Sequence, residues 1–247
     1  MPPTSTLLLI TAVFLLAGFV KGMLGLGLPT VAVALLTASL GLPQAIALVL
    51  IPAFLTNVWQ ALAGGHTRAL TLRLWPFLIP ATLTVWIGAK ALAQVDAKTL
   101  SSVLGVLLVV YAGVNLARFR LTISPRQERW AGPLVGAVNG VFTGMTGSFT
   151  VPGVMYLQSI GLSRDALIQA MGMLFTLSTV ALAVALSGNN LLTREIALAS
   201  LLAMIPVLTG VAAGGWMRQR LSEATFRRAF FLSLLALGLY IIVAAIR

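Results

Sequence analysis

The sequence contains no cysteine, a single histidine and only five acidic residues among its 247. Without cysteine, the chain can form neither disulfides nor thiolate metal sites. One histidine and so few carboxylates also leave too few groups for a metal cluster or a serine–histidine–aspartate triad within the chain. We therefore expect no enzyme activity, no metal site and no cofactor.

Charge is scarce as well. Charged residues make up 9% of the chain, whereas a soluble protein carries about 25%. The hydrophobic share is 59%, and the mean hydropathy is +1.03. Such a chain cannot cover a surface of its own in water, which excludes a soluble enzyme and a nucleic-acid-binding module. Because a bilayer span needs about 20 apolar residues, the length predicts an all-α polytopic membrane protein with roughly eight to ten spans.

The charge that is present is mostly positive, with 16 lysines and arginines and a net charge of +11. In a membrane protein this excess is explained by topology, because basic residues collect in cytoplasmic loops. The first twenty residues carry no charged side chain. They therefore lack the basic region of a cleavable signal peptide, and we expect the first apolar run to be a retained span.

Apolar runs alternate with short polar or glycine- and proline-containing stretches along the whole chain. The most polar stretch lies near the middle, and we divide the chain there into a first membrane repeat, residues 1–120, a basic linker, residues 121–130, and a second membrane repeat, residues 131–247. Helices are predicted over residues 4–21, 28–40, 43–63, 71–92, 99–118, 131–145, 150–161, 164–187, 195–217 and 226–246.

The two halves resemble each other. Gly18-Phe-Val-Lys-Gly-Met-Leu-Gly25 matches Gly140-Val-Phe-Thr-Gly-Met-Thr-Gly147, and three further matches follow in the same order. A constant order and a nearly constant offset indicate an internal duplication. The further matches are Ser39–Leu42 with Ser159–Leu162, Thr56 with Thr176, and Ile79-Pro80 with Ile205-Pro206.

The number of crossings depends on the short segments 28–40 and 150–161. If neither crosses, eight spans remain and the basic residues divide almost evenly between the two sides. If both cross, there are ten spans, and twelve basic residues face four across the membrane. That bias is typical of a real topology, so we favour ten crossings with both termini outside. Five spans in each half would make the repeats inverted, as in many secondary transporters.

Each half has one apolar run interrupted by glycine and proline, over Gly22–Pro29 and over Gly144–Pro152. Interrupted short segments in corresponding places are the best sequence indication of a transporter's binding site. The exposed N–H groups at a helix N-terminus attract anions, and glycine lets a ligand approach the backbone. We expect two such helix ends to face each other near the middle of the membrane. The alternative role of these glycines is close helix packing.

Polar side chains accompany the interruptions. Asn139, Thr143 and Thr146 form a stripe in the second half, and Lys21 occupies the position that matches Thr143. An ionisable residue within a span indicates function, although Lys21 could instead extend to the membrane interface. Asn57 and Gln60 could line a pocket or bond between helices. The candidate anion-binding residues are Lys21, Gly22, Gly25, Gly27, Asn57, Gln60, Asn139, Thr143, Gly144, Thr146, Gly147 and Ser148.

The segments Gly18–Pro29 and Gly140–Pro152, with Leu40–Pro43 and Ile160–Ser163 after them, resemble the sulfite exporter TauE/SafE family of bacterial membrane permeases. The resemblance implies a multi-pass protein of the bacterial cytoplasmic (inner) membrane that moves sulfite or sulfonates such as sulfoacetate. Where that family has a dense run of glycines, this chain has Leu26 and Leu28 interleaved, and Ser148, Phe149 and Thr150 in the second half.

We therefore expect a secondary transporter for a small anion, working by alternating access between the two repeats. Its partners would be the anion and the lipid bilayer, with no nucleic acid, and a homo-oligomer is left open. One alternative is a cation or metal permease, which would need acidic, histidine or methionine clusters in the spans. Another is a non-transporting membrane subunit of an enzyme complex, which would not need the polar stripe of the second half.

Overall fold

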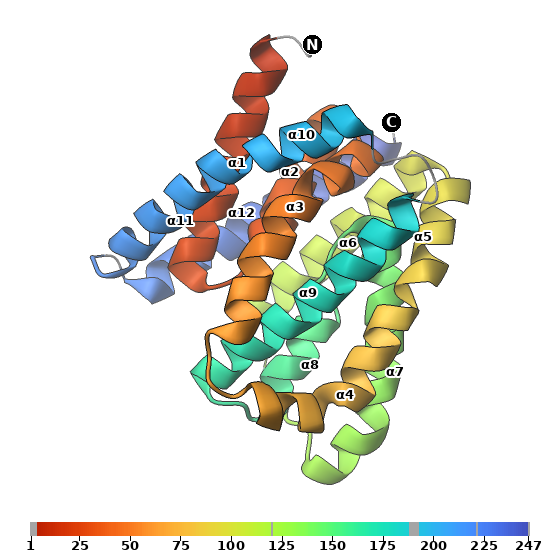
Figure 1. The fold of residues 1–247 in the computed structure, drawn as a ribbon, viewed down its shortest axis with the longest axis vertical. Coiled ribbons are helices and arrows are strands. Elements are labelled where there is room, and N and C mark those ends of the chain that lie inside the picture. Colours follow the sequence, from red (N-terminus) through yellow and green to blue (C-terminus); the bar gives the residue numbers. More distant parts are fainter. Residues whose placement is uncertain (1–3, 120, 188–192, 221, 247) are drawn as a thin grey trace. The chain divides into compact units, whose positions relative to one another are not determined.

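The computed structural model describes residues 4–119, 121–187, 193–220 and 222–246, and the regular secondary structure of these residues is all helical, with no strand. Figure 1 shows the order of the helices along the chain. Their bounds are α1 Thr4–Leu24, α2 Leu28–Leu40, α3 Leu42–Leu62, α4 Thr67–Leu83, α5 Val85–Gln94, α6 Ala97–Leu116, α7 Pro125–Thr146, α8 Gly153–Ser159, α9 Arg164–Ser187, α10 Arg194–Leu202, α11 Met204–Arg218 and α12 Glu223–Ile246.

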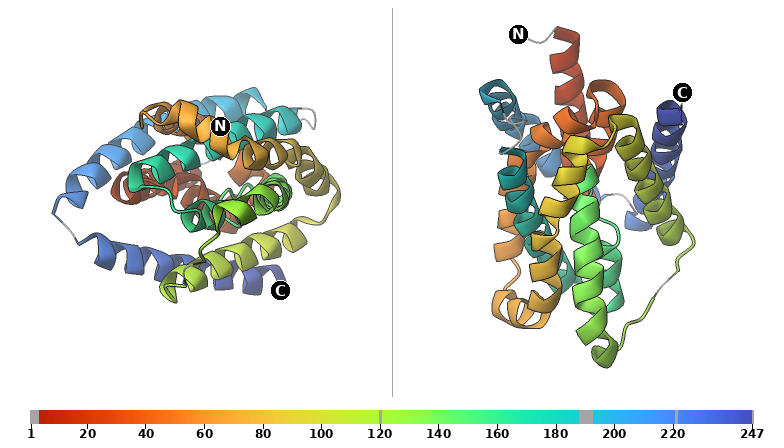
Figure 2. Two further views of the ribbon diagram at one scale, coloured as in Figure 1. Left: turned by 90° about the horizontal axis from the view of Figure 1, so that it is seen from below. Right: turned by 90° about the vertical axis from the view of Figure 1, so that its right-hand side faces the viewer.

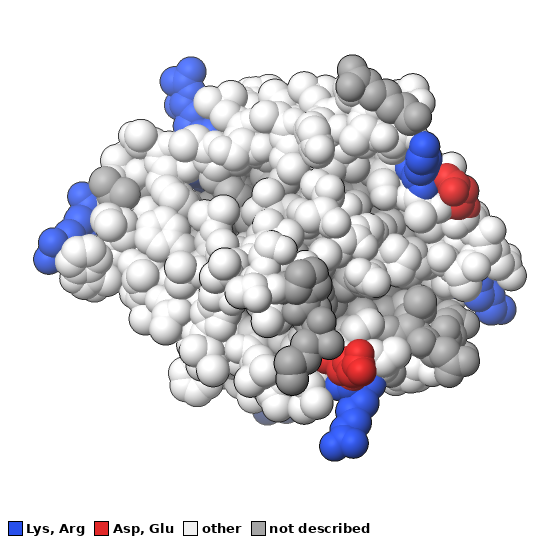
Figure 3. Space-filling view, turned by 90° about the horizontal axis from the view of Figure 1, so that it is seen from above, with Lys and Arg blue, Asp and Glu red and all other residues white. Residues whose placement is uncertain are grey.

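Seven helices or helix pairs of the described chain are long and apolar enough to cross a membrane: α1, α3, α4 with α5, α6, α9, α10 with α11, and α12. Large apolar side chains are exposed on their outer faces, with Leu8, Leu62 and Leu72 each about two thirds exposed. Figure 3 shows a face on which charged side chains are few. The protein is therefore a multi-pass membrane protein. Ten crossings exceed the seven found by length and composition.

Every predicted helix overlaps at least one helix of the structure, but two of them are interrupted. The helix predicted over 71–92 is divided at Thr84, and the one predicted over 195–217 is divided at Ala203. Pro206 follows the second division and has no N–H to bond to the carbonyl of Leu202, so the helical ladder loses a bond there. Hydrophobic periodicity does not detect such a local interruption.

Two helix ends also differ from the prediction. The helix predicted over 131–145 begins earlier, at Pro125, because Ser124 and Gln127 form a capping box at its start. The first residues of α7 are polar, so the apolar run used for the prediction begins after them. The helix predicted over 150–161 covers only Gly153–Ser159.

The helices form two compact units. Unit 1 contains residues 1–52, 97–117 and 192–247, and unit 2 contains residues 53–96 and 118–191. The boundary passes through α3 at Pro52, so each unit holds part of this helix. Each unit also combines helices from the first and the second half of the sequence.

In unit 1, α1 packs against α11 at backbone distance. A Cβ atom at Gly18 would meet the carbonyl of Val207, and one at Gly22 would meet the carbonyl of Val211. Residues further along α1 contact residues further along α11, so the two helices run parallel. Glycine is required here because any larger residue would separate the two backbones.

The other long pair of unit 1 consists of α6 and α12, which lie side by side in Figure 2. Gly105 of α6 lies beside Ile242 of α12, with 2.7 Å between an ideal Cβ at Gly105 and the nearest side-chain atom. Further along α6, the ring of Tyr111 lies 5.4 Å from the ring of Phe231. Residues further along α6 contact residues earlier in α12, so these two helices are antiparallel. The short helix α2 contacts α1, α6 and α12.

In unit 2, α7 packs against α4 and α5 in the same manner as α1 against α11. A Cβ atom at Gly140 would meet the carbonyl of Ala81, and one at Gly144 would meet the carbonyl of Val85. Thr84, at the division between α4 and α5, donates a hydrogen bond of 2.7 Å to the Ala137 carbonyl. The helices run parallel, and the contacting glycines of α7 are the ones that match Gly18 and Gly22 in the sequence.

One ion pair connects three helices of unit 2. The Arg73 guanidinium donates two hydrogen bonds of 2.9 Å to the Glu128 carboxylate and one of 2.7 Å to the Ile160 carbonyl. Arg73 belongs to α4, Glu128 to α7, and Ile160 follows the last residue of α8. The pair therefore holds the far end of α8 against the start of α7.

Candidate functional site

The second break, residues 147–152, separates α7 from α8 in unit 2. Gly147 ends α7 with φ +66°, and its N–H donates a 2.8 Å hydrogen bond to the Thr143 carbonyl. This left-handed conformation is one that glycine adopts without strain. All of residues 146–151 are buried, so irregular backbone and polar side chains lie together inside the unit.

Side chains of the predicted stripe hold this break in place. Thr143 donates a 3.1 Å hydrogen bond to the Ser148 carbonyl, and Thr146 accepts one of 3.2 Å from the Ser148 N–H. Thr146 in turn donates to the Phe142 carbonyl, at 2.7 Å. The hydroxyls of Ser148 and Thr150 lie 3.1 Å apart. The two stripe threonines therefore use their protons within the protein.

Asn139 connects the stripe to α8. Its Oδ1 accepts a 2.8 Å hydrogen bond from the N–H of Gly153, the first residue of α8. The side chain is fully buried, and its Nδ2 has no hydrogen-bond partner among the described residues. The sequence predicted that the N–H groups at the start of α8 would bind the anion. The first of them instead donates to the Asn139 side chain.

The first break, residues 25–27, separates α1 from α2 in unit 1. Gly25 has φ +75°, and its N–H donates a 2.8 Å hydrogen bond to the Lys21 carbonyl. Gly27 has φ +101° and precedes α2, which has Pro29 in its first turn. Lys21 lies one turn before the break, and only 8% of its surface is exposed.

The two breaks share their backbone geometry. Gly25 and Gly147 match in the sequence, both have left-handed backbone, and both N–H groups bond to the carbonyl four residues earlier at 2.8 Å. The residue that supplies this carbonyl is Lys21 in unit 1 and Thr143 in unit 2. Gly41 and Gly161, which follow the short helices, also share a positive φ. The sequence match thus extends to the local backbone geometry at these glycines.

Asn57 and Gln60 lie on the part of α3 that belongs to unit 2. Gln60 donates a 2.7 Å hydrogen bond to the Ile168 carbonyl of α9, and Asn57 is fully buried. A further buried amide, Gln169, bonds to the Ala61 carbonyl at 2.7 Å and accepts from the His66 N–H at 2.9 Å. These amides join the end of α3 to α9.

The structure thus divides the predicted candidates between the two units. Lys21, Gly22, Gly25 and Gly27 belong to unit 1, and the other eight candidates belong to unit 2. Gly22 and Gly144 contact the backbone of α11 and α5, so these two serve helix packing. Sequence reasoning missed Ser178, a buried serine of α9 whose Oγ has no hydrogen-bond partner among the described residues. Its only signal is a small polar residue in the middle of an apolar helix.

Comparison with protein families gives one match. The family model described as Sulfite exporter TauE/SafE matches residues 10–241, nearly the whole chain and both breaks. No curated protein and no solved structure matches the chain.

Proposed function

The chain belongs to the sulfite exporter TauE/SafE family, and on that premise we propose that it is a secondary transporter for a small anion, sulfite or an organosulfonate such as sulfoacetate. The paired breaks are the observation that supports this function. Within a membrane, irregular backbone is tolerated only where it is buried in protein or lines a wet cavity. Matching broken helices in two repeats mark the substrate site in many transporters.

In each unit we assign one side chain to binding an anion, Lys21 in unit 1 and Asn139 in unit 2. Lys21 is a buried cation beside the first break, and a positive charge in a low-dielectric setting attracts an anion strongly. Asn139 has an N–H donor to offer beside the second break. Thr143, Thr146 and Gly147 fix the backbone around Ser148 and so act by positioning it.

The direction of the helices in unit 1 supports ten crossings. Because α6 and α12 are antiparallel, an even number of crossings lies between them. The candidates are α7, α8, α9 and the α10–α11 pair, so α8 must be counted. The chain from Gly147 to Ser159 reaches at most about 30 Å, enough for the hydrocarbon core. Because α1 and α11 are parallel, an odd number of crossings separates them, which requires α2 as well.

The same pair supports inverted repeats. In the duplication, α6 is the last helix of the first repeat and α12 is the last helix of the second. Their antiparallel packing in unit 1 is what inverted copies would produce.

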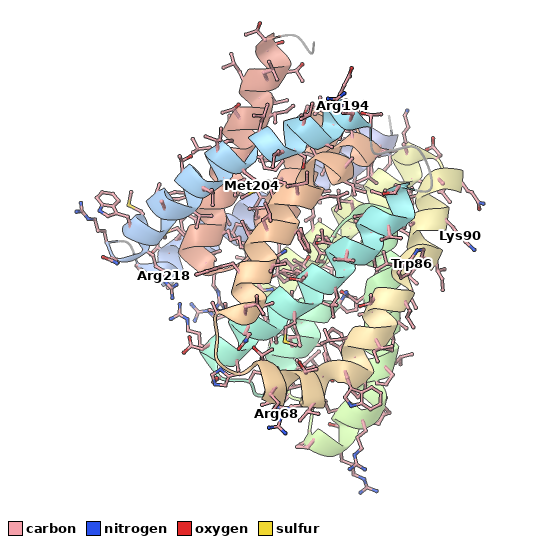
Figure 4. The ribbon with its side chains drawn as sticks, in the orientation of Figure 1. Arg68, Trp86, Lys90, Arg194, Met204 and Arg218 are labelled. Atoms are coloured by element: carbon pink, nitrogen blue, oxygen red, sulfur yellow. The ribbon has the colours of Figure 1, made fainter. Side chains whose placement is uncertain are left out.

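Figure 4 shows a basic residue at each end of two long spans, Arg68 and Lys90 on α4–α5, and Arg194 and Arg218 on α10–α11. We propose alternating access by movement of one repeat against the other, as in other transporters with inverted repeats.

The membrane potential supplies a driving force for export. A cell interior negative by about 100 mV favours expulsion of a monovalent anion by about 2.3 kcal/mol. Export of such an anion therefore needs no coupled ion.

The test is flux through purified protein in liposomes. We expect saturable uptake of sulfite or sulfoacetate that depends on an imposed potential, positive on the side that receives the anion, and no flux in protein-free liposomes. A divalent metal ion serves as the third substrate. Metal flux without anion flux would replace this proposal by the cation permease, and no flux of any of the three would favour a non-transporting subunit.

A further inference from the structure

Among the described residues of unit 2, Asn139 and Ser178 each carry a buried hydrogen-bond donor without a hydrogen-bond partner. One is the Nδ2 of Asn139 on α7, and the other is the hydroxyl of Ser178 on α9; neither has a partner in the described part of the chain. Asn139 is fully buried and so is Ser178. An unpaired buried donor destabilises a protein, so each of the two is a candidate contact for a bound molecule that carries an acceptor.

The orientation of the Asn139 amide is fixed by its neighbour. The Gly153 N–H can only donate, so the amide atom 2.8 Å from it must be the oxygen. The NH₂ group is therefore the free end of the side chain. An NH₂ group only donates hydrogen bonds, so its partner must carry an acceptor, which excludes a metal ion or another cation.

Two contacts locate Ser178 relative to Asn139. An ideal Cβ at Gly153 would lie 2.5 Å from Asn139 Oδ1 and 3.0 Å from Leu174 Cδ2, so the start of α8 contacts both α7 and α9 at this level. Ser178 lies one turn further along α9 than Leu174, about 6 Å along the helix axis. At the same level, the ring of Phe149 in the second break packs 5.6 Å from the ring of Phe175.

We propose that Asn139 and Ser178 form a subsite for the oxygen atoms of an oxyanion beside the second break of unit 2. This inference rests on the proposed function and adds to it: the subsite binds sulfite or a sulfonate head group through neutral donors. The Ser148 and Thr150 hydroxyls support it, because their mutual hydrogen bond uses one proton and leaves the other to donate. An oxyanion offers several acceptor oxygens, one for each of these donors.

The chain supplies a matched control in the adjacent residue. Thr179 is also buried, but its hydroxyl donates a 2.6 Å hydrogen bond to the Phe175 carbonyl of its own helix. Ser178→Ala removes an unused donor, and Thr179→Val removes one that is already paired. Asn139→Asp is the second variant, because it keeps the oxygen that accepts from Gly153 and replaces the NH₂ donor by a second oxygen.

The test uses the full-length protein and sulfite, with two readouts: the half-saturating concentration for flux in liposomes and the sulfite-dependent rise in melting temperature in detergent. We expect Ser178→Ala to raise the half-saturating concentration about tenfold and to reduce the thermal shift, without lowering the melting temperature in the absence of sulfite. Asn139→Asp should abolish the thermal shift. Thr179→Val should leave the half-saturating concentration within about twofold of wild type.

The outcomes separate this inference from the proposed function. A wild-type protein that transports sulfite, with the same half-saturating concentration in Ser178→Ala and Asn139→Asp, would overturn the subsite and leave the transporter standing. A protein that gives a sulfite-dependent thermal shift, lost in both variants, but no flux would support the subsite and overturn transport. Absence of both flux and thermal shift in the wild type would overturn both.

Discussion

Lys21 is the residue that we propose as the positive charge beside the first break. It lies within α1, is 8% exposed, and occupies the position that Thr143 holds in unit 2. Burying a charged side chain in a span is costly and is retained chiefly where function needs it. The two breaks share their local backbone geometry, while Lys21 stands beside one of them and Thr143 beside the other.

We expect Lys21→Met to lower anion flux by about tenfold or more, because it removes a charge-assisted contact while keeping a side chain of similar length. The measurement is sulfite flux in liposomes at matched protein content, with expression and melting temperature compared in parallel. Lys90→Met is the control, since Lys90 is an exposed lysine on α5. Unchanged flux in Lys21→Met would remove this residue from the site.

At the scale of single elements, glycine pairs determine which helices lie together. Gly18 and Gly22 of α1 fit against the backbone of α11, and Gly214 of α11 fits against Phe19 and Met23 of α1. In the lipid, helix association depends on such close packing, because lipid tails are as apolar as leucine. The interface is thus selected by shape rather than by hydrophobicity.

Two adjacent glycines of α11 allow a direct test of this packing. A Cβ at Gly214 would lie too close to the backbone of α1, whereas one at Gly215 would meet no atom within 4 Å. We expect Gly214→Ala to destabilise the protein by about 1–3 kcal/mol through overpacking. Gly215→Ala should be neutral or stabilise α11 by up to about 1 kcal/mol. Thermal unfolding in one detergent compares the two, and equal effects would contradict an interface built on Gly214.

At the scale of the whole molecule, helices from the two halves of the sequence are interleaved. α1 packs against α11, and α7 packs against α4 and α5. Neither half of the sequence therefore contains all the packing partners of its own helices. The ten-crossing, inverted arrangement proposed above makes these two pairs equivalent.

Reporter fusions after residues 65, 122 and 190 test that arrangement. With ten crossings and both termini outside, the first two fusions report a cytoplasmic position and the third an external one. With eight crossings, because α2 and α8 then do not cross, all three report the same side. The second result would be inconsistent with antiparallel packing of α6 and α12 and would end the argument for inverted repeats.

Part of the candidate site was predictable from residue types and spacing. Glycine at a left-handed position is a local requirement, so Gly25 and Gly147 could be identified as break residues without the fold. The same reasoning could not assign Gly22 and Gly144 to packing, because that contact depends on which helix lies opposite. The sequence signal of Ser178, a small polar residue within an apolar helix, does not distinguish it from other such residues, since what sets it apart is the lack of a hydrogen-bond partner among the described residues.

The sequence by itself determined the membrane class, the approximate positions of the helices and the two glycine-containing breaks, at residues 25–27 and 147–152. These properties follow from composition, apolar run length and the backbone preferences of glycine and proline, all of which act over a few residues. Only the tertiary structure decided which helices pair, where α4–α5 and α10–α11 divide, and which polar groups stay unpaired. Those depend on contacts between segments far apart in the chain, where shape and hydrogen-bond geometry select one partner among many apolar helices.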